Sequence, residues 1–184
     1  MITRWPPDRG FTLIELVSIM VVIGVLAVVA IPKLNSSAFQ ERGFRDGVFT
    51  TLTHARRVAM ASRRFVCVSI VSGTGSGATA SMTRDNGDTT PETATAATAI
   101  NCTQNVALPS PMSRCASTNQ VCAPSGVSLG CGTCVTIAPG IFGVIFDPQG
   151  RSISTPTVTA SAQASITISN QPPVTVATET GYVQ

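Results

Sequence analysis

The order of apolar and polar positions divides the chain into three parts. Residues 13–31 are apolar except at Glu15, Ser18 and Gly24. At a rise of about 1.5 Å per residue, a helix of this length crosses the hydrocarbon core of a bilayer. Apolar positions then recur at helical spacing as far as Arg64, and beyond it they alternate with a period of two. The pattern therefore predicts an apolar helix, an amphipathic helix and a β-rich region, in that order.

The helical pattern continues past Pro32, so we predict one stem that covers residues 11–64. Its apolar positions after the proline are Leu34, Ala38, Phe44, Val48, Phe49, Leu52, Ala55, Val58 and Ala59. Gly43 and Gly47 weaken the pattern, and Pro32 removes a backbone donor, so we expect a kink or a loosened turn at the proline. A stem that is helical throughout would reach on the order of 80 Å.

Strand signals follow in residues 65–184. The segments with strand composition or alternation are 65–73, 143–147, 164–169 and 174–178. Residues 74–105 leave two alternatives, a weak hairpin around the turn signal at 85–88 or a mobile insertion. If an antiparallel sheet packs on the upper stem, one face of the sheet and one face of the stem helix are buried. We therefore predict an α+β fold, in which a long N-terminal membrane-spanning helix packs on an antiparallel β-sheet head.

Charge is distributed unevenly, although the formal net charge is only +3. Between Glu41 and Arg64, two acids are outnumbered by six arginines: Arg42, Arg45, Arg56, Arg57, Arg63 and Arg64. From Phe65 onward, three arginines face five acids: Asp85, Asp88, Glu92, Asp147 and Glu179. The stem arginines are interpreted as the polar face of a helix that leaves a membrane. Contacts to neighbouring subunits or to an anionic ligand are the alternatives.

Six cysteines lie in the predicted head: Cys67, Cys102, Cys115, Cys122, Cys131 and Cys134. An even number in a loop-rich region beyond a membrane segment predicts disulfides in an oxidising compartment. A zinc site or a redox-active Cys131-x-x-Cys134 pair are the alternatives. Sequence alone does not choose the pairing. Our working arrangement is two local bridges, Cys115–Cys122 and Cys131–Cys134, with Cys67–Cys102 tying the first strand to the insertion.

Glu15 is the unexpected residue of the apolar run. A carboxylate in hydrocarbon costs a few kcal/mol, so an acid there is a functional hypothesis by default. Three interpretations of the N-terminus compete: a passive anchor, a signal peptide cut near residues 28–30, and a chain cut between Gly10 and Phe11. Only the last gives Glu15 a partner, because Phe11 then carries a free amino group about one helical turn away.

The stretch "RGFTLIEL", which includes Gly10, Phe11 and Glu15, resembles the class III signal of type IV pilins and type II secretion pseudopilins. The resemblance implies that prepilin peptidase cleaves between Gly10 and Phe11 and methylates Phe11. It also implies that Glu15 pairs with the N-terminus of an adjacent subunit during assembly. The chain would then comprise a leader (1–10), a stem (11–64, with 11–31 transmembrane) and a cysteine-containing head (65–184).

The head is similar to the GspH/FimT group of minor pilins and pseudopilins. The stretches that carry this resemblance are "ARRVAMASRR", "GVIFDPQGR", "ITIS" and "TGYV". It implies a structural subunit at or near the filament tip that helps to initiate or cap assembly of a pilus or pseudopilus. Its partners would be other pilins or pseudopilins through the stem, prepilin peptidase and the inner membrane. Because Arg4 and Arg9 flank the apolar run, the N-terminus is predicted to be cytoplasmic and the head periplasmic.

Two further functions were weighed against this one. Some FimT-like members are believed to bind DNA through a Gly-Arg-x-Arg element, but Gly150-Arg151 is followed here by Ser152 and Ile153. Nucleic acid is therefore the less favoured partner. An enzyme is not expected, since His54 is the one histidine and no nucleophile elbow, phosphate loop or paired-carboxylate pattern occurs. We expect no cofactor and no metal.

Overall fold

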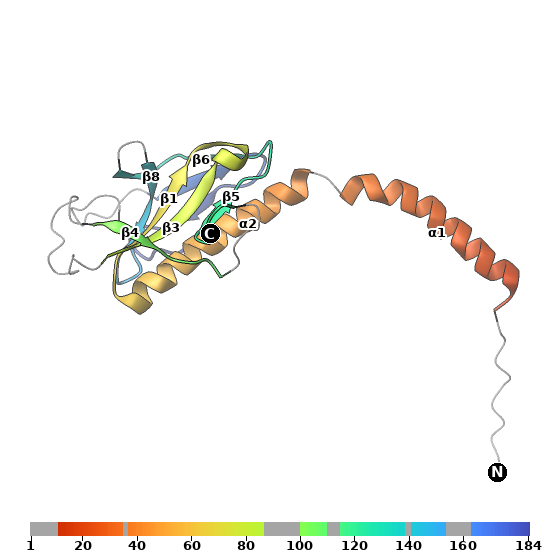
Figure 1. Cartoon of the computed structure of the whole chain (residues 1–184), viewed down its shortest axis with the longest axis horizontal. Coiled ribbons are helices and arrows are strands. Elements are labelled where there is room, and N and C mark those ends of the chain that lie inside the picture. Colours follow the sequence, from red (N-terminus) through yellow and green to blue (C-terminus); the bar gives the residue numbers. More distant parts are fainter. Residues whose placement is uncertain (1–10, 35–36, 87–99, 110–114, 139–140, 154–162) are drawn as a thin grey trace, which may run out of the picture. The chain divides into compact units, whose positions relative to one another are not determined.

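The structure is a computed structural model that describes residues 11–34, 37–86, 100–109, 115–138, 141–153 and 163–184 (Figure 1). The side chains of residues 28–37, Ala138 and Ile141 lie outside the described set. The chain divides into two compact units, Met1–Ser37 and Ala38–Gln184. The second unit therefore contains almost all of the upper stem together with the predicted head.

The stem consists of two helices. Helix α1 spans Leu13–Leu34 and contains Pro32, and helix α2 spans Ser37–Ser62. Residues 35 and 36 between the two helices lie outside the described set, so the single stem predicted for residues 11–64 and the kink expected at Pro32 stay predictions. Among the described residues, no helix reaches the length and apolarity that crossing a membrane demands.

Helix α2 is amphipathic, and its apolar face forms part of the head. The residues of that face are almost completely buried: Phe44, Val48, Leu52, Ala55 and Ala59. Their spacing of three and four residues places them in one stripe along the helix. They share a core with strands of both sheets described below, and Figure 1 shows α2 running along those strands. The packing predicted between the upper stem and the head is confirmed.

Among the described residues, the strands form two antiparallel sheets. Their bounds are β1 Val66–Val71, β2 Gly73–Thr74, β3 Thr79–Asp85, β4 Cys102–Asn105, β5 Gln120–Cys122, β6 Ser128–Cys131, β7 Val135–Ala138, β8 Ile141–Phe146, β9 Ser152–Ile153, β10 Ala164–Ile168 and β11 Val174–Val176. One sheet has the order β4-β3-β1-β8-β7, with β5 also paired to β3 and β9 to β8. The other has the order β11-β10-β6-β2. The α+β class with an antiparallel head is confirmed.

Strand β1 separates two apolar clusters. Val66, Val68 and Ile70 belong to the core shared with α2, while Phe65 and Cys67 belong to a second cluster on the opposite face. Since successive side chains of a strand point to opposite faces, this is the alternation that the sequence predicts. The larger sheet is therefore covered on both sides along its central strand.

The predicted strands agree with β1, β8, β10 and β11. In the Thr-rich segment, β3 pairs antiparallel with β4, which begins at Cys102 and not directly after the turn signal at 85–88, as the hairpin alternative would require. Residues 87–99 lie outside the described set. Strands β5, β6 and β7 were not predicted. They contain only three or four residues each, which is too short for alternation to stand out against loop composition.

Two glycines bring the β8–β9 turn and the C-terminal turn together. Gly150 and Gly181 both have positive φ, +82° and +60°. A Cβ built on Gly181 would overlap the carbonyl oxygen of Gly150, and one built on Gly150 would lie 2.8 Å from Sδ of Met60. Glycine is therefore required at these positions for two reasons: the backbone has positive φ, and neighbouring atoms approach too closely for a Cβ.

Replacing Gly181 with alanine should lower the free energy of unfolding by about 1–3 kcal/mol, because the new Cβ meets backbone and the left-handed conformation becomes strained. Gly77→Ala is the matched control, since its Cβ would enter open space, and its effect should stay within about 0.5 kcal/mol. Denaturant unfolding of the full chain in detergent, followed by circular dichroism, measures both. Equal losses in the two variants would contradict the close approach.

Candidate functional site

The first turn of α1 is capped by Thr12. The backbone N–H of Glu15 donates to the carbonyl oxygen of Thr12 at 3.1 Å and lies 3.3 Å from its side-chain Oγ1. Thr12-Leu-Ile-Glu15 is also the sequence pattern of a capping box, which satisfies orphan donors at a helix start. Sequence reasoning missed Thr12, although a Thr three residues before a Glu at the start of an apolar run is a recognisable signal.

The first turn of α1 thus gives a local structural reason for an acid at position 15, in addition to the predicted role of Glu15 in assembly. It lies in the first turn, where a negative charge is favoured by the helix dipole. No described acid–base contact within the chain engages its carboxylate. Capping needs only a side chain that accepts a hydrogen bond, and glutamine also serves in a capping box. The helix dipole therefore gives the negative charge of Glu15 a local reason, and what local structure does not supply among the described residues is a cationic partner.

The described side chains of α1 are exposed around the helix, from its first residue to residue 27, including Leu13 at 82% and Met20 at 66%. A helix that is apolar on all sides is stable only when another apolar phase surrounds it.

The predicted cleavage bond is described only on one side. Phe11 is 75% exposed and precedes the start of α1, whereas Gly10 lies outside the described residues. Cleavage and methylation at Phe11 consequently stay predictions. If the bond is cut, the new amine stands next to Thr12, at the beginning of the capped turn.

All six cysteines are paired, in the predicted arrangement. The bridges are Cys67–Cys102, Cys115–Cys122 and Cys131–Cys134, with Cα–Cα distances of 6.1, 5.6 and 5.7 Å. These distances lie within the usual range for disulfides. The zinc alternative needs free thiolates, and no cysteine is free.

The three bridges differ in their surroundings. Cys67 is fully buried in the second apolar cluster, and its bond to Cys102 closes the longest loop. Cys131 and Cys134 are half-buried and are separated by the exposed residues Gly132 and Thr133. The first bridge therefore staples the sheet internally, whereas the last one fixes a tight bend at the surface.

The beginning of α2 is held by the turn between β10 and β11. The buried carboxylate of Glu41 accepts a hydrogen bond from Nδ2 of Asn170 at 3.2 Å. Nε of Arg45 donates to the carbonyl oxygen of Pro172 at 3.0 Å. These two charged side chains therefore have a structural role within the chain, which the interpretation of the stem arginines as a polar face did not include.

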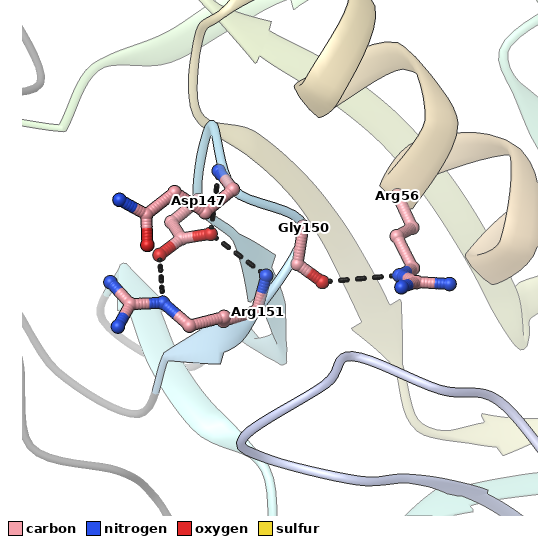
Figure 2. Close-up of polar contacts among 5 residues, drawn as sticks. Arg56, Asp147, Gly150 and Arg151 are labelled. Atoms are coloured by element: carbon pink, nitrogen blue, oxygen red, sulfur yellow. Dashed lines mark hydrogen bonds and ion pairs between the residues drawn. The ribbon is translucent and has the colours of Figure 1, made fainter.

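Figure 2 shows the turn that follows β8, at residues 147–150. The carboxylate of Asp147 accepts from the backbone N–H of Gln149 and Arg151, and Nε of Arg151 donates to it at 2.7 Å. From α2, Nε of Arg56 donates to the carbonyl oxygen of Gly150 at 3.2 Å. The turn is thus closed internally by Asp147 and tied to the stem by Arg56.

His54 lies half-exposed on α2. Among the residues that the structure describes, no group of three or more histidine, cysteine, aspartate or glutamate side chains is placed to hold a metal ion. The described polar contacts of the head therefore close its turns and fasten them to α2, and the disulfides link its cysteines.

Comparison with known proteins identifies the N-terminal segment. Residues 5–31 match the model of the prokaryotic N-terminal methylation motif, which confirms the resemblance seen from Arg9 to Glu15. No curated protein sequence matches the chain. Among solved structures, the chain is similar to the minor pseudopilin EpsH from the type 2 secretion system of Vibrio cholerae, with a TM-score of 0.48 and 14% identity over 79% of this chain and 94% of that one.

The bridges should differ in their contribution to stability. Replacing Cys67 and Cys102 together with alanine removes a constraint across 35 residues, and replacing Cys131 and Cys134 removes one across 3. The chain-entropy model gives losses of about 4 and about 2 kcal/mol, respectively. Chemical unfolding of the two double variants at equal protein concentration provides the comparison. If removing the Cys131–Cys134 bridge lowers the free energy of unfolding more, the assignment of Cys67–Cys102 as the bridge that staples the sheet is wrong.

Proposed function

We propose that the chain, which carries the methylation motif of prepilin leaders, is a minor pilin or pseudopilin that enters a type IV pilus or a type II secretion pseudopilus. In this proposal, prepilin peptidase cleaves between Gly10 and Phe11 and methylates Phe11. The single observation that carries the proposal is an α1 helix exposed on every described side, with one charge, Glu15, in its first turn.

Membrane residence before assembly follows from the apolar run. Residues 11–31 would form a single transmembrane segment in the inner membrane, with Arg4 and Arg9 on the cytoplasmic side. The head would then be periplasmic. Its three disulfides support this compartment, because such bonds persist where the environment is oxidising.

Assembly would transfer α1 from lipid into a bundle of similar helices. Lipid tails are as apolar as the side chains of a neighbouring stem, so burial alone supplies little driving force. Close packing and polar pairing must then provide specificity. The carboxylate of Glu15 and the amino group of Phe11 on the adjacent subunit are the polar pair that we propose, and their contact would set the register between the two stems.

The function is structural rather than enzymatic. Subunits that carry this motif build filaments, and their work is done by packing surfaces. The similarity of the head to the GspH/FimT group supports a place at or near the filament tip, where the chain would initiate or cap assembly. The head is rigid enough for such a role, since α2 and strands of both sheets share one core.

DNA binding is the alternative function, and the described contacts disfavour it. Arg151 is engaged by Asp147, and Nε of Arg84 donates to Gln104. Binding of duplex DNA depends on several cationic side chains that neutralise phosphates. A head whose described arginines already serve the chain's own turns and strands provides a poor surface of that kind.

The decisive experiment separates the charge of Glu15 from its capping role. Glu15→Gln keeps a side chain suited to a capping box but removes the charge, and Glu15→Ala removes both. Both variants should be cleaved normally and should lose filament incorporation by at least about tenfold. Ser18→Ala, which removes a hydrogen bond to the Glu15 carbonyl in the same turn, is the matched control and should assemble normally.

Immunoblots of sheared filaments measure incorporation, and mass spectrometry of the membrane form reports the first residue and its methylation. Normal incorporation of Glu15→Gln would show that capping, and not the ion pair, is what the filament requires. A mature chain that begins downstream of Phe11 would refute the proposed function altogether.

A further inference from the structure

The three disulfides differ in how deeply their cysteines are buried. Cys67 is 0% exposed and Cys122 is 4% exposed, so two of the bridges each have one cysteine inside the apolar core. In the third bridge, Cys131 and Cys134 are both only half-buried. This is therefore the one bridge in which both cysteines are partly open to solvent.

Burial of the leaving sulfur decides how readily a disulfide exchanges with a thiol. In that reaction a thiolate attacks one sulfur of the bridge, and the other sulfur leaves as a thiolate. A charged group in an apolar interior is costly. Attack on Cys102 would release the thiolate of Cys67 inside the second apolar cluster. Attack on Cys115 would likewise release the buried Cys122 as a thiolate.

The Cys131–Cys134 bridge does not carry this penalty. Each of its cysteines is partly open to solvent, so either sulfur can be attacked and either can leave as a thiolate that water solvates. The intervening residues, Gly132 and Thr133, are exposed, so the bend between the cysteines is presented at the surface. The bridge that is most open to attack is thus also the one with the best-solvated leaving group.

The bend between these two cysteines is also held without the disulfide. The N–H of Gly132 donates to the carbonyl oxygen of Ser165 at 2.8 Å, and Oγ1 of Thr133 donates to the carbonyl oxygen of Gln163 at 2.6 Å. Strand β6, which ends at Cys131, also pairs with β10. Because none of these contacts uses a sulfur atom, the two thiols stay close together after reduction and the bond can form again.

The bridge lies where the chain passes from one sheet to the other. Strand β6, which ends at Cys131, belongs to the smaller sheet, and β7, which begins directly after Cys134, belongs to the larger one. Both cysteines also pack against the core that α2 shares with the strands. Opening the bond therefore loosens the connection between the sheets, while the hydrogen bonds of the bend keep that connection in place.

We infer that Cys131–Cys134 is a site of thiol–disulfide exchange, which takes two electrons from a dithiol while the head stays folded. One thiolate of the dithiol attacks a bridge sulfur, forms a mixed disulfide and releases the other cysteine as a thiolate, which takes up a proton from water. The second thiolate of the dithiol then attacks the dithiol's own sulfur in the mixed disulfide and releases the remaining cysteine. The bridge is thereby reduced to two thiols, and the dithiol leaves as a disulfide.

Exchange at this bridge does not require filament assembly, so it can fail while the proposed function holds, and the reverse. Timed reduction of the wild-type full chain in detergent tests it. The protein is mixed with dithiothreitol at neutral pH, free thiols are blocked with iodoacetamide at intervals, and mass spectrometry of the peptides reports the alkylated fraction of each cysteine. Circular dichroism follows the fold over the same times.

We expect Cys131 and Cys134 to be reduced at least about tenfold faster than the other four cysteines, with the spectrum of the folded protein retained. Equal rates at all three bridges would overturn the inference, since burial of the leaving sulfur would then have no effect. Faster reduction of either other bridge would overturn it as well. So would loss of the folded spectrum in step with reduction of Cys131–Cys134, because the bond would then be a structural requirement and not an exchange site.

Thr133→Val tests whether the bend keeps the two thiols together, because it removes the hydroxyl that donates to Gln163 and nearly preserves the size of the side chain. In a buffer of reduced and oxidised dithiothreitol, the equilibrium of this variant should shift toward the dithiol by about threefold. Thr136→Val is the matched control, since Thr136 is exposed on β7, and it should behave as the wild type. A Thr133→Val equilibrium equal to that of the control would overturn the holding role of the bend.

A dithiol can come from a small molecule or from a protein, and a second reductant separates these sources. The timed reduction is repeated with reduced thioredoxin, a protein dithiol, in place of dithiothreitol. Reduction of Cys131 and Cys134 by both reagents supports exchange with a protein that reaches the exposed bend. Reduction by dithiothreitol alone supports exchange with small dithiols.

Discussion

The interaction on which the rest depends is the burial of the apolar surface of α1. Its described side chains are exposed all round, and nearly all of them are apolar. The free energy of exposing such a surface to water is large, since each buried methylene contributes about 0.8 kcal/mol. In our proposal, lipid surrounds the helix before assembly and other helices surround it afterwards. The carboxylate of Glu15 then needs a polar partner, and the proposed cleavage would supply one as the amino group of Phe11.

Helix α2, in contrast to α1, belongs both to the stem and to the core of the head. Its buried stripe from Phe44 to Ala59 closes the head, while Glu41 and Arg45 fasten its first turns to the turn between β10 and β11. Arg56 is also tied to the turn after β8, whereas Arg42, Asp46 and Arg57 are exposed. Apolar packing holds α2 against the sheets, and the polar contacts fix its position along them.

Much of this architecture could be predicted from residue patterns. The long strands β1, β8 and β10 alternate clearly, and the three disulfides follow the order of the cysteines. Strands β5, β6 and β7 were missed because each is only a few residues long and is specified by its neighbours in the sheet. The division of the strands into two sheets was missed for the same reason, since pairing between distant segments leaves no local signal. Thr12 was missed although its signal is local, because Glu15 was interpreted through its charge alone and not as part of a capping pattern.

The order of the disulfides has a consequence for biogenesis. Each cysteine is bonded to the next one along the chain, so the three loops follow one another without nesting or crossing. A polypeptide that is threaded through a translocon from its N-terminal side exposes Cys67 first, then Cys102, and so on to Cys134. An oxidase that joins thiols in their order of emergence therefore produces the native set directly. Maturation of this head would then require no isomerase to shuffle mispaired bonds.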